Sequence, residues 1–275
     1  MSLLTRVLGS LEARLNQPRL SLWRTLYFNF RTLPFSMAIK LPVFIYSKVH
    51  LFELNGSISF ENTSIHRGMV KIGINAESFA LCDHSGFIQL ASNKSKIVFE
   101  GPASISVNDK IRVVAGELRF GKYAYLGEGI RVVCNGSSIY IGAYSRIAFE
   151  TVIMNSGFHH VYNSNKKSIT RTTRPIHIGQ YCWIGNRCSI SAGAVIKDFT
   201  IVCAGSLVNR DFALTEGENQ MLGGSPAKLI CCGMKRIFSP KLESQVITWF
   251  LEHPDENTYP YEEFNDNITD INSEF

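Results

Sequence analysis

No run of eighteen consecutive apolar residues occurs in this chain of 275 residues, so we expect no segment of it to cross a membrane as a helix. The sequence also lacks a P-loop, a dinucleotide-binding fingerprint and a zinc-finger spacing of Cys and His, and we expect no nucleic-acid partner. Its seven Cys are odd in number and scattered, and no secretory signal is seen. These features predict reduced thiols, a cytoplasmic protein and no metal site, which would need better-grouped ligands.

What the chain does contain is an aliphatic residue at every sixth position toward its C-terminal end. The six positions are Ile178, Ile184, Ile190, Ile196, Val202 and Val208. A period of six fits neither the 3.6 residues of a helical turn nor the two of a strand. It is typical of a β-solenoid, in which each side of a prism contributes one hexapeptide and stacks an inward aliphatic residue on the next coil. Six matches in a row disfavour the alternative of two buried strands and a turn.

The same period continues upstream with interruptions. Further rungs are expected at Ile141, Ile147 and Ile153, and before them at Val114, Phe120, Leu126 and Val132. We therefore predict one solenoid from about residue 52 to residue 211, with insertions at its corners between about residues 85 and 140. A polar excursion at about 154–177 breaks the hexads. A long excursion from a regular scaffold is usually functional or disordered.

Three motifs of this region resemble those of the hexapeptide-repeat acetyltransferases. Residues 175–185 resemble the family's P-I-x-I-G-x-x-x-W-I-G stretch, residues 204–211 its A-G-S-x-V-x-K/R-D turn, and residues 223–228 its G-x-P-A-K exit. The match covers roughly residues 110–232. It is closest to the bacterial polysaccharide and serotype sugar O-acetyltransferases, which are related to the maltose and galactoside acetyltransferases. This resemblance implies a left-handed parallel β-helix, a homotrimer, and acetyl-coenzyme A as donor.

The resemblance also implies a catalytic His just after the last hexad before the excursion. By its position His159 aligns with that residue, and His160 is the second candidate. A base is needed because an acceptor hydroxyl is a poor nucleophile until it loses its proton, and an imidazole with a pKa near 7 suits this task. Backbone N–H groups would hold the oxyanion. Gly157 stands where the family often has Asp, so Glu150, a main-chain carbonyl or a group of the next subunit must orient the imidazole.

The donor site follows from the solenoid geometry together with the resemblance. Positions eighteen apart stack in successive coils, so Asn186 should lie beneath Ala204, where backbone groups can pair with the pantetheine amides. The residues that align with the family's coenzyme A contacts are Asn186, Ala204, Asn209, Arg210 and Lys228. Arg210 and Lys228 can meet phosphate charge. Trp183 is either a wall of this site or an aromatic residue that shields a coil face.

The two ends of the chain differ in charge. Residues 1–51 form a basic amphipathic segment, in which Glu12 is the sole acidic residue against seven Lys and Arg within the first fifty positions. Such a segment can cap the open first coil of a solenoid or lie on an anionic membrane surface; we favour the cap, and the two roles are compatible. The β-helix domain is expected at residues 52–232. Residues 233–275 are expected to form a short helix, 241–253, and an acidic tail.

The sequence thus predicts a mainly β protein that transfers acetyl groups from acetyl-coenzyme A to a sugar hydroxyl of a surface or capsular polysaccharide or its precursor. N-acetylation of an amino sugar is the enzymatic alternative. Two other classes are a γ-carbonic-anhydrase-like zinc hydrase, which needs three His from separate coils whereas His159 and His160 are adjacent, and a non-catalytic β-helix scaffold. The expected partners are a saccharide acceptor, two further copies of the chain and, through residues 1–50, the inner membrane surface.

Overall fold

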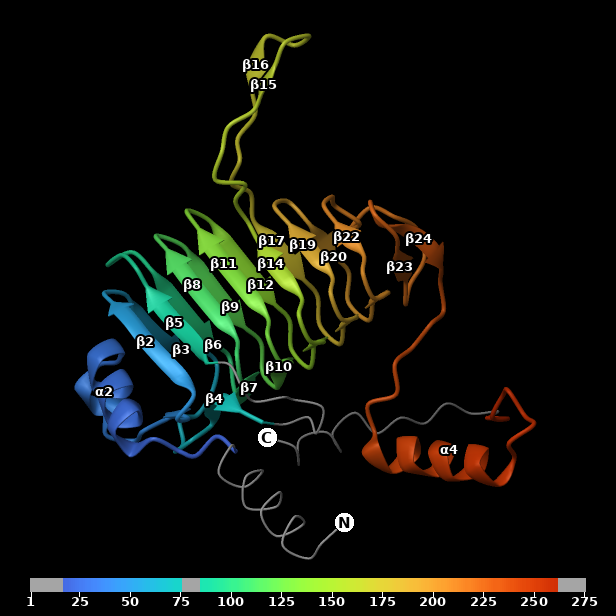
Figure 1. Ribbon diagram of the computed structural model, residues 1–275, viewed down its shortest axis with the longest axis horizontal. Coiled ribbons are helices and arrows are strands. Elements are labelled where there is room, and N and C mark those ends of the chain that lie inside the picture. Colours follow the sequence, from blue (N-terminus) through green and yellow to red (C-terminus); the bar gives the residue numbers. More distant parts are fainter. Residues whose placement is uncertain (1–16, 76–84, 262–275) are drawn as a thin grey trace, which may run out of the picture. The chain divides into compact units, whose positions relative to one another are not determined.

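The structure, a computed structural model, describes residues 17–75 and 85–261. The chain divides into two compact units, Met1–Met234 and Lys235–Phe275. The first unit is a three-sided parallel β-helix, visible in Figure 1 as stacked coils with a hairpin projecting from one corner. Its three faces are three sheets, which we call sheets I, II and III in the order in which a coil passes through them.

Successive coils add one strand to each sheet as far as β20, and the paired strands of successive coils run parallel. Sheet I contains β1 (Val43–Ile45), β4 (Val70–Ile74), β7 (Ala103–Ser106), β10 (Ala124–Leu126), β13 (Arg146–Ile147), β18 (Trp183–Ile184), β21 (Ile201–Val202), β23 (Met221–Gly223) and the antiparallel β24 (Lys228–Cys231). Sheet II contains β2 (Val49–Leu54), β5 (Gly86–Leu90), β8 (Lys110–Val114), β11 (Arg131–Asn135), β14 (Val152–Met154), β19 (Ser189–Ser191) and β22 (Leu207–Val208). Sheet III contains β3 (Ser57–Phe60), β6 (Lys96–Phe99), β9 (Glu117–Phe120), β12 (Ser138–Ile141), β17 (Ile176–Ile178) and β20 (Val195–Ile196).

The core is the column of inward aliphatic residues that the six-residue spacing predicts. All six positions from Ile178 to Val208 are at most 1% exposed. Residues eighteen apart are direct partners in neighbouring strands, as with Ile178 and Ile196, or Ile184 and Val202. Each rung therefore packs on the rung above and the rung below it, and burial of these side chains supplies the main driving force of the fold.

From β6 to β14 the coils are longer by three residues than those after the excursion, and the extra residues lie at the corner between sheets II and III. Phe120 pairs with Ile141 and Val132 with Ile153, twenty-one positions apart in each case. The predicted rung at Val114 is therefore wrong: the residue of β8 that pairs with Val132 is the fully buried Ile111, and Val114 is half-buried on the outer side. The coil repeat also starts at β1, inside the segment 1–51 that we expected to precede the solenoid.

Helix α2 (Leu22–Thr32), followed by the single turn α3 (Phe35–Ala38), covers the open end of the first coil. Its inward side chains, among them Phe28 and Asn29, are fully buried. The Asn29 amide donates to the carbonyl of Val43 at 2.7 Å and accepts from its N–H at 3.2 Å, so it occupies an edge position of β1. The backbone groups of Val43 at the edge of the sheet are thereby paired, as a solenoid end requires.

The corner between sheets III and I carries a ladder of aromatic rings, of which the first pair is tilted and the next two pairs are stacked. Tyr123, Tyr144, Tyr181 and Phe199 occupy equivalent places in four successive coils, with centroid separations of 5.1, 5.0 and 4.8 Å. All four have positive φ values between 54° and 59°. Left-handed backbone at a bulky residue is strained, and the packing of each ring on the next contributes compensating contact energy.

The second unit contains helix α4 (Pro240–Glu252). Ser239 caps its N-terminus by accepting from the N–H of Leu242, and Pro240 fills the first helical position. The helix matches the prediction over residues 241–253 within one residue at each end. Residues 262–275 of the predicted acidic tail lie outside the described residues. None of the helices within residues 17–75 and 85–261 is both long and apolar enough to cross a bilayer.

Candidate functional site at the projecting hairpin

The predicted excursion leaves the solenoid at the corner between sheets II and III, where earlier coils carry their three extra residues. It runs from the end of β14 to the start of β17 and contains an antiparallel hairpin, β15 (Tyr162–Asn163) and β16 (Ser168–Ile169). Both strands are exposed along their whole length, and in Figure 1 the hairpin stands clear of the coils. The sequence located the excursion correctly but gave no sign of the hairpin within it.

Buried polar residues fix the base of the hairpin. The side chain of Asn155 is fully buried, and its Oδ1 accepts from the N–H of Asn135 on the preceding coil at 2.8 Å. Its carbonyl accepts from the N–H of Arg174 on the returning arm at 3.1 Å. Ser156, also buried, accepts at Oγ from the Thr173 hydroxyl at 3.2 Å. The two arms are therefore held to each other and to the prism, although the hairpin beyond them is exposed.

A cavity of about 600 Å³ opens beside this base. Among its lining residues are Asn135, Ser137, Ser156, His160, Arg171 and Arg174. They come from the corner of the preceding coil and from both arms of the hairpin. The volume lies in the usual range of small-molecule sites, and convergent polar groups are what orients a ligand in such a site.

The two candidate bases lie on the outgoing arm, and both are exposed. His160 lines the cavity together with Phe158, whereas His159 does not. The backbone N–H of His159 donates to the carbonyl of Gly157 at 2.7 Å, and Phe158 between them has a φ of 58°. Within residues 17–75 and 85–261 neither imidazole has a hydrogen-bond partner for its ring nitrogens.

Glu150, one of the groups expected to orient the imidazole, does not do so within one chain. Its Oε2 pairs with Nε of Arg187 at 2.6 Å. Glu150 precedes β14 whereas the hairpin follows it, so the carboxylate and the two His lie at opposite ends of that strand.

The expected donor residues fall at two different corners. Asn186 and Ala204 stack as predicted at the corner between sheets I and II, where the N–H of Gly205 donates to the Asn186 carbonyl at 2.9 Å. In the following coil the same corner comes after β23, just before Lys228, the first residue of β24. These backbone groups and the exposed Lys228 form one edge of the prism.

Asn209 and Arg210 lie instead at the corner between sheets II and III, on the same side as the hairpin. The Arg210 guanidinium packs over the ring of Phe212 with 4.7 Å between Cζ and the ring centroid. The backbone carbonyl of Arg210 accepts from the Val195 N–H. Trp183 stands on the outer face of sheet I and is 41% exposed. One chain therefore does not bring Arg210 and Lys228 to the same corner.

The cysteines of the core are unsuited to nucleophilic catalysis. Burial raises the pKa of both Cys134 and Cys182 to about 12, so neither forms a thiolate near neutral pH. Across the described residues, no group of three or more His, Cys, Asp or Glu could hold a metal ion.

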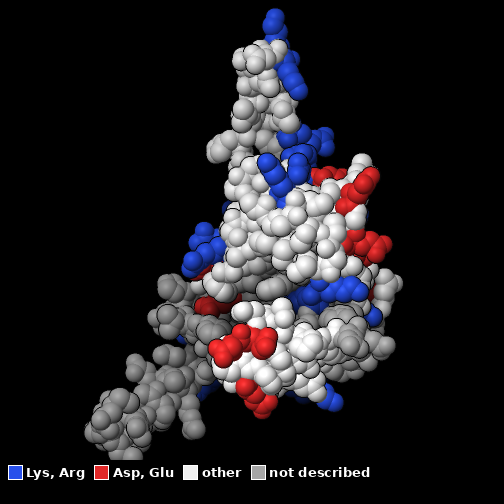
Figure 2. Space-filling view, turned by 90° about the vertical axis from the view of Figure 1, so that its right-hand side faces the viewer, with Lys and Arg blue, Asp and Glu red and all other residues white. Residues whose placement is uncertain are grey.

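Sequence reasoning missed the cations of the cavity, Arg171 and Arg174. A signal was present, because no Asp or Glu occurs between Glu150 and Asp198. Figure 2 shows the consequence: Lys and Arg side chains line the projecting hairpin at the top of the view, and no acidic side chain appears on it.

In sequence the chain is similar to acetyltransferases of polysaccharide biosynthesis, and in fold it is similar to a solved acetyltransferase structure. The putative colanic acid biosynthesis acetyltransferase WcaF of Escherichia coli (strain K12) is 29% identical over 114 residues, which cover 42% of this chain and 58% of WcaF; WcaF of Shigella flexneri matches equally. The chain thus spans a little over half the length of these relatives. No protein-family model matches it.

Among solved structures, the chain is similar to the polySia specific acetyltransferase NeuO, with 16% identity, a TM-score of 0.51, and coverage of 78% of this chain and 90% of NeuO. At this identity the likeness concerns the fold. The prediction of a left-handed parallel β-helix is confirmed, as is the resemblance to hexapeptide-repeat acetyltransferases that the three motifs indicated.

Proposed function

Because the chain is similar in sequence to acetyltransferases of polysaccharide biosynthesis, we propose that it transfers the acetyl group of acetyl-coenzyme A to a hydroxyl of a surface or capsular polysaccharide or its precursor. The observation that carries this proposal is the 29% identity with WcaF over 114 residues, together with a hairpin arm that carries two His, one of which lines a polar cavity. The zinc hydrase and scaffold alternatives have no comparable support.

The chemistry requires one base and one donor site. The base, His159 by its position in the motif or His160 by its place in the cavity, takes the proton of the acceptor hydroxyl as its oxygen attacks the thioester carbonyl. The tetrahedral oxyanion is stabilised by backbone N–H groups. The C–S bond then breaks, coenzyme A leaves as a thiolate and takes up a proton, and no acyl-enzyme is formed. These steps require none of the buried cysteines.

The position of the two halves of the site supports a homotrimer with composite sites. Asn186, Ala204 and Lys228 lie at one edge of sheet II, and His159 and the cavity at the other. If sheet II faces the threefold axis, each groove between neighbouring prisms receives the His-bearing corner of one chain and the donor corner of the next. Light scattering should then report three chains per particle; a stable and fully active monomer would refute this arrangement.

The outer side of α2 and α3 supports a peripheral membrane contact. Large apolar side chains stand exposed there: Leu22, Trp23, Leu26, Tyr27, Phe30 and Phe35. Residues 17–52 contain no acidic residue and five Lys and Arg. Aromatic and basic side chains on one helix favour the interface of an anionic bilayer, and we infer a cytoplasmic enzyme at the inner membrane surface. Vesicles rich in phosphatidylglycerol should sediment the protein, and the Trp23→Ala/Phe35→Ala variant should stay in the supernatant.

A screen of thiol release tests the proposed activity. Purified protein is incubated with acetyl-coenzyme A and with sugars, amino sugars and polysaccharide fragments side by side, and free coenzyme A is measured. Release that depends on a hydroxyl acceptor supports O-acetylation. Release with amino sugars alone would instead establish N-acetylation, and the absence of release with every acceptor would favour the scaffold.

A further inference from the structure

The hairpin and its flanks carry charge of one sign only. Between Glu150 and Asp198 the chain has no acidic residue but six Lys and Arg. Four of these lie on the excursion itself: Lys166, Lys167, Arg171 and Arg174. All four side chains are exposed. We call these four the hairpin cations.

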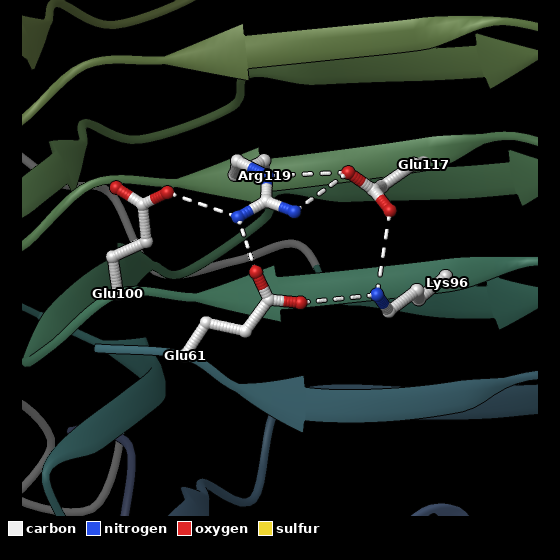
Figure 3. A network of polar contacts seen from close by, with 5 residues as sticks. All are labelled: Glu61, Lys96, Glu100, Glu117 and Arg119. Atoms are coloured by element: carbon white, nitrogen blue, oxygen red, sulfur yellow. Dashed lines mark hydrogen bonds and ion pairs between the residues drawn. The ribbon is translucent and has the colours of Figure 1, made fainter. Parts of the chain in front are cut away.

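The hairpin cations differ from the other clustered charges of the solenoid in having no counter-charge. On sheet III, Lys96 and Arg119 pair with three glutamates at 2.7–3.4 Å, and Figure 3 shows this closed network. Within the part of the chain that the structure describes, none of the hairpin cations makes an ion pair. A compensated cluster holds a sheet face together, whereas four uncompensated cations create a positive field around the hairpin.

Two of the hairpin cations are placed at the cavity. Arg171 and Arg174 line it together with His160, one of the two candidate bases. Arg174 is positioned by packing: its guanidinium lies over Gly193 of the next coil, where a Cβ would come within 2.8 Å of Cζ and where φ is +84°. Any side chain at residue 193 would displace the guanidinium. Lys166 and Lys167 lie farther out, in the turn between β15 and β16.

We propose that the acceptor is an acidic saccharide whose carboxylate is bound by Arg171 and Arg174, with further acidic units of the same chain along Lys166 and Lys167. This rests on the proposed function. A guanidinium binds a carboxylate through two parallel N–H donors and so fixes its orientation, which would hold a neighbouring hydroxyl close to the imidazole. The spread of the cations from the cavity to the hairpin turn fits an extended oligosaccharide rather than a monosaccharide.

The competing anion at this site is the phosphate end of coenzyme A. The donor motif supplies its own exposed cations. Lys228 lies at the corner between sheets I and II, away from the hairpin, and Arg210 lies two coils beyond the hairpin at the corner between sheets II and III. The two assignments predict different kinetics. If the hairpin cations bind the acceptor, their loss raises the KM for the acceptor and leaves the KM for acetyl-coenzyme A unchanged.

The first experiment compares two acceptors that differ only in charge. Oligosaccharides prepared from a uronic-acid-containing polysaccharide are used intact and after chemical reduction of their carboxylates, with coenzyme A release as the readout. We expect kcat/KM to be at least about tenfold higher for the intact form, since more than one charge pair is involved. The advantage should shrink as salt is raised. Equal use of both forms would overturn the inference while leaving the acetyltransferase proposal intact.

Equilibrium binding of the same two oligosaccharides, fluorescently labelled, separates the inference from the activity. Preferential binding of the intact form without thiol release would support the acidic site and count against the transferase. Binding of both forms alike would overturn the acidic site whatever the activity.

The second experiment uses variants at exposed positions. Arg171→Gln and the pair Lys166→Gln/Lys167→Gln are each expected to raise the acceptor KM about threefold to fivefold, the scale of exposed charge pairs. Lys94→Gln is the matched control, because Lys94 is an exposed cation at the same corner on an earlier coil. A raised KM for acetyl-coenzyme A, a loss of anionic-vesicle binding, or an equal effect of Lys94→Gln would each overturn the assignment.

Discussion

Replacement of Asn155 by Ala tests whether the base of the hairpin is fixed by one buried amide. The Asn155 side chain is fully buried, and its Oδ1 accepts from the Asn135 N–H at 2.8 Å. Asn155→Ala leaves that donor without a partner, which costs about 1–3 kcal/mol. For a unit of this size each kcal/mol corresponds to about 2–4 °C in Tm. A loss of about 2 kcal/mol therefore predicts a Tm that is lower by about 4–8 °C.

A second asparagine in the same hairpin provides the control. Asn163 also accepts a backbone N–H at Oδ1, from Lys166 at 2.9 Å, but it lies in the exposed part of the hairpin. The donor that Asn163→Ala releases can bind water instead, so the expected loss is at most about 0.5 kcal/mol, or less than about 2 °C. The two variants thus remove the same kind of hydrogen bond, one from a buried site and one from an exposed site.

The assay is thermal unfolding followed by circular dichroism at one protein concentration, because assembly makes Tm depend on concentration. The acceptor KM is measured in parallel, since a loosened base should also disturb the cavity. Equal Tm values for the two variants would refute the idea that burial decides the cost. An unchanged Tm for Asn155→Ala would show that the hairpin base is held by other contacts.

Three further predictions concern the site and the core. His159→Ala should lower turnover at least about a hundredfold, the scale of general-base loss, with acetyl-coenzyme A binding near wild type; an inactive His160→Ala beside an active His159→Ala would reverse the assignment. Arg210→Ala and Lys228→Ala should each raise the KM for acetyl-coenzyme A about fivefold to tenfold with turnover unchanged, and a collapse of turnover at constant KM would place them in the chemistry. Burial raises the pKa of Asp109 well above its usual value, so its stabilising contribution is complete below the unfolded pKa of about 4 and is lost as the pH rises toward the folded pKa. The Tm of the wild type relative to Asp109→Asn should therefore fall as the pH rises above about 4, and a constant difference from pH 4 to 8 would contradict this.

The regular part of the fold was predictable because each inward position of a coil requires an aliphatic side chain. Every rung from Ile178 to Val208 must be aliphatic to pack on its neighbours, so the spacing alone locates the faces of the prism. The spacing failed at Val114, since three extra residues at a corner shift the inward position and leave no mark in composition. The six-residue spacing predicts the inward positions only where the corners of the coils are uniform in length.

The corners themselves carry features that a single sequence does not reveal. The stack of Tyr144 on Tyr181, 5.0 Å apart, joins residues thirty-seven positions apart across the excursion. Their pairing depends on where the long loop leaves and rejoins the solenoid, which is settled only in three dimensions. The same holds for Asn155, whose burial is set by the coil that precedes it. The motifs located the two His, but their surroundings depend on contacts of this long-range kind.

The missing orienting group of the imidazole is best explained by the arrangement of sheet II. From β14 onward its outer side presents half-buried residues that are apolar or small and polar, among them Val152, Ser189 and Leu207. A half-buried face without charged residues, between two functional corners, is suited to contact between copies of the chain. Such a contact would bring the donor corner of one copy, with the Glu150 carboxylate at the same end of β14, toward the hairpin of the next. The acidic partner that Gly157 does not supply would then come from another chain, and the activity would depend on assembly.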